Sequence, residues 1–168
     1  IRESIKTTTV KPSGTVSILA GESPGVHWTP GGKHFLRTIR FGNDDPMLPL
    51  FKASGYRIEP AAESPKTTSV VYFPIESNAS RSEKDVSIYE KVSLAAMAQR
   101  HWSDNSVSVT ISFSPDEKAA VGTVLHMFDG QLKTVSFLPM GNETYPQMPY
   151  TQISQEDYEA YKFTLLPI

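Results

Sequence analysis

The sequence contains no cysteine among its 168 residues. A chain without thiols forms no disulfide, holds no zinc through thiolates and carries out no thiol chemistry of its own. Only four histidines are present, and His27 and His34 stand seven residues apart with no carboxylate at ligand spacing. We therefore expect no metal site in this chain, and we expect any cysteine-dependent step to occur on residues outside it.

An excess of one charge and a long hydrophobic run are also missing. Lysine and arginine total 16, aspartate and glutamate total 18, and the net charge of −2 provides no basic field for a nucleic-acid backbone. No apolar run approaches the ~20 residues that cross a bilayer, and no signal-peptide core opens the chain. We predict a cytoplasmic protein that binds neither nucleic acid nor membrane.

Two features that are common at the ends of a complete chain are also missing. The chain begins without methionine at Ile1 and stops at Ile168 without a polar tail. We expect it to be a piece of a longer protein, although a processed chain would look the same. With no internal repeat and no low-complexity linker, residues 1–168 are expected to form a single segment.

Strand-like and helix-like segments alternate along the chain. β-branched and apolar runs predict strands at 5–10, 34–41, 68–73, 107–113 and 132–138. Capped segments predict helices at 13–20, 44–55 and 85–101, with two more opening at 114–117 and 153–158. An irregular loop is expected over 139–149. This order favours an α/β fold with a mostly parallel sheet and right-handed crossovers.

Three of these segments make detailed predictions about burial and capping. The nearly continuous apolar run at 68–73, which includes Tyr72, predicts a strand covered on both faces. Glu117 completes a capping box on Ser114, and Ser154 is placed to cap the last helix. The helix over 85–101 is expected to be well buried through one wide apolar face made of Ile88, Val92, Ala95 and Ala96, widened by Tyr89, Leu94 and Met97.

The first predicted strand leads into a loop, Lys11-Pro12-Ser13-Gly14-Thr15-Val16, that has the chemistry of an anion cradle. The first turn of a helix has unpaired amide hydrogens and a partial positive charge, and small residues let an anion approach them. Ligands of α/β sheets bind at the carboxyl ends of strands, so we predict that this loop holds nucleotide phosphates. An ordinary serine cap with a tightly packed glycine would look the same, and no Walker A or dinucleotide motif is present.

Other candidates for chemistry are weaker. Ser13 or Ser17 could act as a nucleophile, but the Gly-x-Ser-x-Gly elbow and a His–Asp pair are missing, so a hydrolase is disfavoured. His27 follows a Ser-Pro-Gly turn and precedes Trp28. We expect it to pack against or cap a loop, with contact to a nucleotide or cofactor as the alternative.

An ordered set of motifs resembles the class II, adenosylcobalamin-dependent ribonucleotide reductases, most closely their monomeric ribonucleoside-triphosphate branch. The set covers nearly the whole chain and comprises residues 8–16 with Leu19-Ala20-Gly21, then Ser23-Pro24-Gly25-Val26-His27, Arg37-Thr38-Ile39-Arg40-Phe41, Asp45-Pro46-Met47-Leu48-Pro49, Ala53-Ser54-Gly55-Tyr56-Arg57, residues 102–111 and Ser136-Phe137-Leu138-Pro139. No single motif is decisive, but their order is specific. The resemblance implies the carboxyl-terminal part of a ten-stranded α/β barrel.

In that family a thiyl radical, generated by adenosylcobalamin, starts the reduction of the nucleotide, and a cysteine pair supplies the electrons. The resemblance implies that the radical cysteine, the catalytic glutamate and the redox cysteines lie outside this chain, so the isolated segment is expected to be inactive. It also implies a ribonucleoside triphosphate substrate, a thioredoxin-like reductant and a monomeric full enzyme. The alternatives are a non-enzymatic α/β module that binds nucleotide phosphates and a structural remnant without a ligand.

The resemblance also implies two sets of binding residues. The substrate phosphates would be held by Pro12, Ser13, Gly14, Thr15 and Val16. The cofactor would face two stretches, about 28–86 and from 145 onward, with contacts from Arg40, Phe41, Tyr145, Pro146, Gln147 and Met148. The second stretch departs from the monomeric branch, whose loop is richer in glycine and lacks Tyr-Pro-Gln-Met-Pro.

Overall fold

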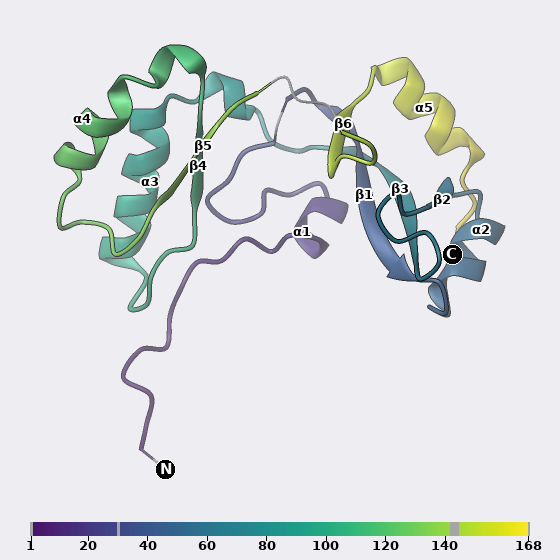
Figure 1. The fold of residues 1–168 in the computed structure, drawn as a ribbon, viewed down its shortest axis with the longest axis horizontal. Helices are drawn as coiled ribbons and strands as arrows, with labels where there is room; N and C mark the ends of the chain where they lie inside the picture. The colour runs from purple at the N-terminus through teal and green to yellow at the C-terminus, as the bar shows by residue number, and fades with distance from the viewer. Residues whose placement is uncertain (1, 30, 142–144, 168) are drawn as a thin grey trace. The chain divides into compact units, whose positions relative to one another are not determined.

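The computed structural model describes residues 2–29, 31–141 and 145–167, and its chain forms two compact units (Figure 1). Unit 1 comprises Ile1–Gly14, Ser23–Gly31 and Ala79–Asn142, and unit 2 comprises Thr15–Glu22, Gly32–Asn78 and Glu143–Ile168. Each unit mixes helices and strands, which confirms the α/β class. Closure of a barrel and the role of 1–168 as one catalytic segment stay predictions.

Unit 1 is built on two parallel strands, β4 (Thr110–Phe113) and β5 (Ser136–Pro139). Between them the chain forms the 3-10 turn η2 (Pro115–Glu117) and helix α4 (Ala120–Met127), while η1 (Glu83–Asp85) and helix α3 (Ile88–His101) precede β4. This strand–helix–strand crossover is the one parallel unit among the described residues, as the alternating pattern predicts. Both strands are shorter than the predicted 107–113 and 132–138.

The core of unit 1 forms where α3 packs against β4. Val107, Val109, Ile111 and Phe113 are all buried, as the period-two pattern predicts, but Ser112 is buried as well, so the alternation ends within β4. On α3 the buried residues Ile88, Val92, Ala95 and Ala96 confirm the predicted face. Two of the three residues expected to widen that face are exposed instead, since Tyr89 is 40% and Met97 54% accessible. Lys91, on the same helix, is buried although it is charged.

The predicted strand at 5–10 is wrong, because these residues form no regular strand. The segment still runs beside residues 105–108, where the Asn105 amide donates to the Thr8 carbonyl at 3.0 Å and the Ser108 amide to the Val10 carbonyl at 2.9 Å. The Thr8 hydroxyl donates to the Trp102 carbonyl at 2.7 Å. A side-chain donor thus bonds to a carbonyl that a backbone amide of a paired strand would otherwise use. β-branched residues favour the extended backbone but do not ensure the pairing.

Unit 2 is a four-stranded antiparallel sheet in the order β2-β3-β1-β6. Its strands are β1 (His34–Gly42), β2 (Ile58–Pro60), β3 (Thr68–Glu76) and β6 (Tyr150–Gln152). The prediction of a mostly parallel sheet is therefore wrong for this unit. β6 begins directly after the segment 139–149 that was predicted as an irregular loop, of which residues 142–144 lie outside the described residues.

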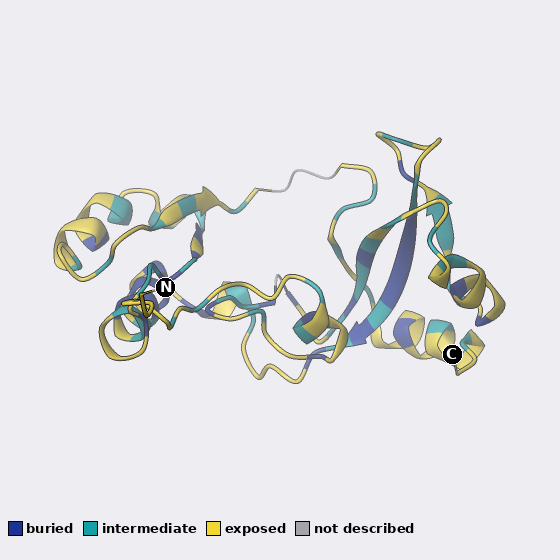
Figure 2. Cartoon of the chain, turned by 90° about the horizontal axis from the view of Figure 1, so that it is seen from below, coloured by how far each residue is buried: buried dark blue, intermediate teal, exposed yellow. Residues whose placement is uncertain are grey.

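Strand β3 is buried on both faces, as its apolar run predicts, and stands out as the dark strand of unit 2 in Figure 2. One face packs with Phe51 of α2 (Met47–Ala53) and Ile18 of α1 (Val16–Leu19). The other face packs with Tyr161 of α5 (Gln155–Thr164). Helices on both faces, not parallel neighbours, account for the continuous apolar sequence.

The sequence predicts the capping of the helices more accurately than it predicts the pairing of the strands. The predicted capping box of Ser114 and Glu117 is present, and the Ser154 hydroxyl accepts from the Asp157 amide at 3.0 Å. In α2 the Asp45 carboxylate accepts from the Met47 amide at 2.9 Å. The exception is the helix predicted over 13–20, which shortens to the four residues of α1.

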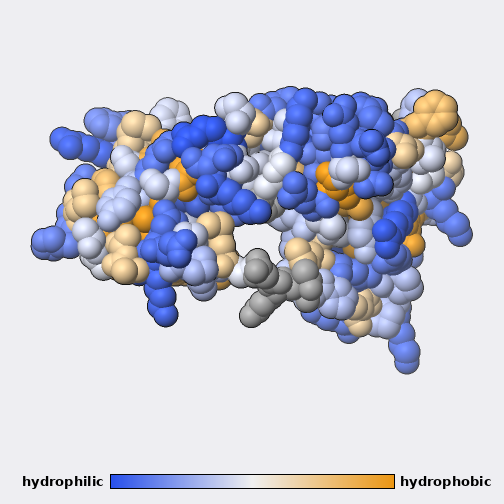
Figure 3. Space-filling model, turned by 90° about the horizontal axis from the view of Figure 1, so that it is seen from above, coloured by the Kyte–Doolittle hydropathy of each residue, from blue (hydrophilic) through white to orange (hydrophobic). Residues whose placement is uncertain are grey.

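The surface shown in Figure 3 is mainly hydrophilic, with small and separate hydrophobic areas. Among the described residues, no helix is both long and apolar enough to cross a membrane. Within the same residues, no group of three histidine or acidic side chains is arranged to hold a metal ion.

Candidate functional site

The predicted phosphate loop crosses the boundary between the units, which falls between Gly14 and Thr15. Gly14 has φ of +67°, a left-handed conformation that favours glycine, and a Cβ built there meets no atom within 4 Å. The position that a side chain would take at Gly14 is therefore open among the described residues. Because α1 has only four residues, its dipole adds little to such a site, so the strand-to-helix cradle predicted from the sequence is wrong in detail.

The two residues that follow Gly14 lie in unit 2. Thr15 precedes α1, and its side chain makes no capping hydrogen bond to the helix. Val16 is 77% accessible, although it is apolar and opens the helix. A polar side chain that does not cap the helix and an exposed valine are consistent with a segment that meets a ligand.

Unit 2 contains a hollow of about 490 Å³ that brings several predicted site residues together. Arg40, Tyr145 and Gln147 from the predicted cofactor set and Thr15 from the predicted phosphate set all line it. The remaining lining residues are Arg37, Thr38, Ile39, Glu63 and Pro149. β1 and the loop at 145–149 thus bring together residues from the two stretches that the resemblance pairs.

The charges of this hollow are only loosely paired. Arg40 reaches Glu63 at 3.8 Å, and both side chains are largely in solvent, so their attraction contributes little to stability. Arg37 is held more firmly, because its Nη1 donates to the Pro149 carbonyl at 3.0 Å and its guanidinium lies 4.6 Å from the centre of the Tyr150 ring. Arg40 therefore keeps a guanidinium that can turn toward an anion or a carbonyl.

The other predicted cofactor residues lie elsewhere in unit 2. Phe41 packs against Phe51 at a ring distance of 5.2 Å, in the aromatic cluster under α2. The Met148 carbonyl accepts from the Thr38 hydroxyl at 2.8 Å, and Pro146 is exposed beside it. None of these three residues lines the hollow.

A network of polar side chains lies on β2 and β3, next to the end of β2 where Gln147 of the loop at 145–149 donates to the Pro60 carbonyl. The Tyr72 hydroxyl donates to Glu59 at 2.7 Å, and Arg57 donates to the other oxygen of the same carboxylate. These two donors, Tyr72 first, lower the pKa of Glu59, while burial and the Glu59 carboxylate raise the pKa of Tyr72 to about 12. Glu59 therefore stays ionised and Tyr72 neutral over the physiological range.

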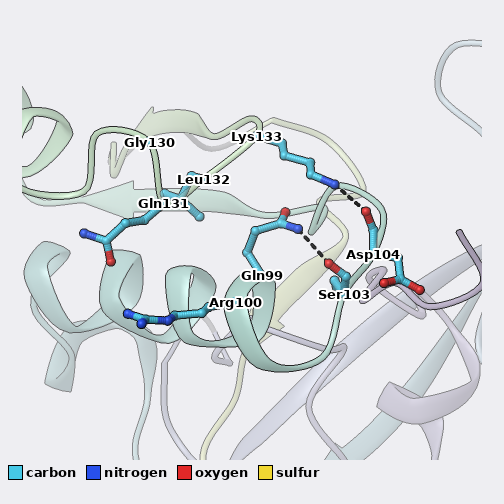
Figure 4. Close-up of a pocket in the computed structure, with 8 residues that line it drawn as sticks. All are labelled: Gln99, Arg100, Ser103, Asp104, Gly130, Gln131, Leu132 and Lys133. Carbon is cyan, nitrogen blue, oxygen red and sulfur yellow. Dashed lines mark hydrogen bonds between the residues drawn. The ribbon is translucent and has the colours of Figure 1, made fainter.

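A second hollow, of about 560 Å³, lies in unit 1 (Figure 4). Lys133 donates to the Asp104 carbonyl and Gln99 donates to the Ser103 carbonyl at 2.9 Å, so these groups bind one another across it. No residue of the predicted phosphate or cofactor set lines this hollow. We therefore take the hollow of unit 2 that Arg40 and Tyr145 line as the candidate site.

His27 has a structural role in unit 1, as expected. Its Nδ1 lies 3.1 Å from the Pro24 carbonyl, and its Nε2 accepts from the Thr110 amide at 3.4 Å. Burial lowers the pKa of the imidazole, more than the Pro24 carbonyl raises it. The neutral ring thus joins the turn at Pro24 to the start of β4.

Two known proteins that are similar to this chain carry the same name. The adenosylcobalamin-dependent ribonucleoside-triphosphate reductase of Euglena gracilis is 44% identical over 164 residues, which cover 95% of this chain and 22% of the relative. The enzyme of the same name from Lactobacillus gasseri is 43% identical over 161 residues, 93% of this chain and 21% of its own length. Comparison with models of protein families finds no match.

A solved structure agrees with these relatives. The crystal structure of a B-12 dependent, class II ribonucleotide reductase superposes with a TM-score of 0.81 at 40% identity, covering 98% of this chain and 23% of that one. The chain is homologous to one segment of class II ribonucleotide reductases. The resemblance seen in the sequence is thereby confirmed, and the chain spans about a fifth of the length of the relatives it matches.

Sequence reasoning missed several residues of the candidate site. Thr38 and Glu63 were not predicted to take part, although both line the hollow. Thr38 is a buried strand residue whose hydroxyl is used by a loop 110 positions away, a contact that no local pattern reveals. Arg37 and Thr38 both stand inside the quoted motif Arg-Thr-Ile-Arg-Phe, so the motif itself was the available signal for these two residues.

Proposed function

We propose that the chain acts as a segment of an adenosylcobalamin-dependent ribonucleoside-triphosphate reductase, in which ribonucleotides are converted to 2′-deoxyribonucleotides. The observation that carries this proposal is the 40–44% identity over nearly the whole chain to enzymes of that name and class. The competing non-enzymatic module has no such support. Thiol chemistry is left to other parts of the enzyme, because this chain has no cysteine.

The first role of the segment is to hold the substrate phosphates at Pro12 to Val16. No atom lies within 4 Å of the position that a Cβ would take at Gly14, and the hydroxyl of Thr15 does not cap α1. These are the features by which a short loop binds phosphate oxygens through backbone amides and hydroxyls. Each of the five residues named from the resemblance, including Ser13 and Val16, remains part of this proposal.

The second role is to face adenosylcobalamin along the hollow of unit 2. The rim of that cofactor bears amide arms and a phosphodiester, which call for both donors and acceptors. Arg40 and the Tyr145 hydroxyl can donate to such a rim, and Glu63 and the Thr15 hydroxyl can accept from it. The residues present therefore fit part of the cofactor's edge, and the bound cofactor would supply the radical that starts nucleotide reduction.

Not all the predicted contacts fit equally well. Phe41 is engaged in the aromatic cluster, so it would support β1 and not touch the cofactor itself. Tyr145, which is 57% accessible, is the better placed aromatic residue. Pro146 and Met148 would contribute through the course of the loop. For the whole enzyme we propose a thioredoxin-like reductant, a monomer and a cytoplasmic location, where thiols stay reduced.

The test uses the full-length protein that contains these 168 residues. Incubated with a ribonucleoside triphosphate, a dithiol and adenosylcobalamin, it is expected to form the 2′-deoxynucleotide, and to form none when the cofactor is omitted. Binding of the triphosphate without any reduction would support the binding module instead.

The cofactor face is tested by Arg40→Ala in the same protein. Loss of one charge-assisted hydrogen bond, about 1.5–3 kcal/mol, corresponds to a rise of about tenfold or more in the KM for adenosylcobalamin. The KM for the triphosphate should stay unchanged. Arg100→Ala, on α3 of unit 1, is the matched control and should change neither constant. Equal effects of the two arginine variants would refute the proposed cofactor face.

A further inference from the structure

The loop at 145–149 contains an unusual backbone conformation. Gln147 has φ of 57°, and it is the only non-glycine residue with a positive φ among those the structure describes. Such a conformation persists in an L residue only where the surroundings hold it. Pro146 and Pro149 flank Gln147 and have no backbone N–H, so the loop has few amides with which to form turn hydrogen bonds of its own.

The side chain of Gln147 provides the missing support from outside the loop. Its Nε2 donates to the Pro60 carbonyl at 2.8 Å, and its Oε1 accepts from the Ala62 amide at 2.8 Å. The two bonds satisfy alternate backbone groups on either side of Ala61, which is 1% exposed. A carboxamide bonded at both ends has a fixed orientation, and here it pairs with the end of β2 as a neighbouring strand would.

The following residues of the loop are fixed to β1. The Thr38 hydroxyl donates to the Met148 carbonyl at 2.8 Å, and the Thr38 amide donates to the Pro149 carbonyl at 3.1 Å. The loop is thus joined to β2 by a side chain and to β1 by its own carbonyls. Tyr145, Gln147 and Pro149 are the residues of the loop that line the hollow.

We propose that Gln147 is a positioning residue, whose carboxamide clamps the loop to β2 and so holds Tyr145 in place beside the cofactor. This inference rests on the proposed function, because it takes the hollow as the cofactor-facing surface. It changes the role predicted from the resemblance, where Gln147 was a direct contact. The bonds to Pro60 and Ala62 fix the orientation of the carboxamide on β2, so its first role is to hold the loop and not to bind an amide arm of the cofactor.

The clamp itself is tested in the full-length protein by hydrogen exchange at one amide. Gln147→Gly keeps a left-handed backbone without strain but removes the carboxamide. The Ala62 amide should then exchange about tenfold faster or more, because it loses its acceptor. Gln147→Glu keeps the size but places a carboxylate oxygen against the Pro60 carbonyl, and should accelerate the same amide. Unchanged exchange of Ala62 in both variants would overturn the clamp.

The positioning role is tested in the full-length reductase with the same two variants. Supporting residues of this kind typically change affinity by about 10-fold to 100-fold. We expect the KM for adenosylcobalamin to rise about tenfold, with kcat at saturating cofactor within about twofold of the original. The exposed Gln155, at the start of α5, provides the matched control, and Gln155→Glu should leave both constants unchanged.

The outcomes separate the two proposals. Faster exchange at Ala62 with an unchanged KM would overturn the positioning role, because the clamp would then be purely structural. If the unaltered full-length protein neither binds nor requires adenosylcobalamin, the proposed function fails and the cofactor role of Gln147 fails with it, whatever the exchange data show.

Discussion

At the scale of single residues, this chain uses polar side chains as substitutes for regular backbone pairing. Gln147 pairs with the end of β2, and Thr8 occupies a carbonyl beside the segment at 105–108. Glu117 accepts from the Ile88 amide at 2.8 Å while it completes its own capping box. Long-range bonds of this kind connect segments that are far apart in sequence, so local patterns predict the residues but not their partners.

Lys91 shows the same limit most clearly. Its helix was predicted to bury an apolar face, yet the lysine is 1% exposed and its Nζ donates to the Ser112 carbonyl at 2.8 Å and to the Ser112 hydroxyl at 3.2 Å. Burial lowers the pKa of this ammonium, and the nearby Glu83 and Glu117 oppose that change. Only the strand packed against α3 reveals why a lysine is tolerated there.

His27 gives a pH prediction at the same scale. Because burial lowers its pKa below 6.5 in the folded chain, the unfolded chain binds more protons, and stability falls as the pH drops below about 6.5. Protonation also removes the Nε2 acceptor of the Thr110 amide. Denaturant unfolding measured from about pH 7.5 to about pH 5 should show this loss, and His27→Gln should reduce it. His126→Gln, on the surface of α4, should leave the pH dependence intact.

At the scale of elements, the sequence predicted which segments are helices and strands better than it predicted how they pair. β1, β3, α3 and α5 lie where the patterns place them, and the serine caps form as expected. Strand direction was wrong in unit 2, because burial on both faces of β3 comes from helices α1, α2 and α5. β6 has only three residues, too few for a pattern to stand out from a proline-rich loop.

The docking of α5 on the sheet gives a prediction for two tyrosines. The Tyr161 hydroxyl accepts from the Arg57 amide at 2.7 Å and donates to the Tyr72 carbonyl at 2.9 Å. Tyr161→Phe leaves two backbone groups without this partner and should lower the free energy of unfolding by about 2–3 kcal/mol. Tyr72→Phe removes a single bond, to the Glu59 carboxylate that Arg57 also pairs, and should lower it by about 1.5 kcal/mol, the lower end of the range for a bond to a charged group. A larger loss from Tyr72→Phe, measured by denaturant unfolding, would contradict this account of the network.

At the scale of the whole molecule, two compact units together match one segment of a much longer enzyme. The α/β class and the family followed from the sequence, because motifs from nearly every part of the chain occur in the family's order. The candidate site followed only in part: Arg40, Tyr145, Gln147 and Thr15 share a hollow, whereas Phe41 is used in the core. An aromatic residue at the end of a strand serves either purpose, and only its neighbours distinguish them.

The absence of cysteine gives a prediction at this scale. The isolated 168 residues should show no reduction of ribonucleoside triphosphates with adenosylcobalamin and a dithiol, because a radical reductase of this class depends on protein thiols. The full-length protein assayed in parallel is the control. Deoxynucleotide formation by the isolated chain would show that the chemistry does not depend on cysteines elsewhere.

The central claim, that the loop at Pro12 to Val16 holds the substrate phosphates, is tested most directly by two glycines. Gly14 and Gly130 both have a left-handed backbone, with φ of +67° and +72°, and a Cβ at either position meets no atom within 4 Å. Gly14→Val and Gly130→Val therefore impose similar strain in similar surroundings.

The measurement is the KM for a ribonucleoside triphosphate in the full-length reductase. We predict a rise of about tenfold or more for Gly14→Val alone, with the KM for adenosylcobalamin unchanged, since loss of one charge-assisted hydrogen bond costs about 1.5–3 kcal/mol. Equal KM values for the two variants would contradict the claim.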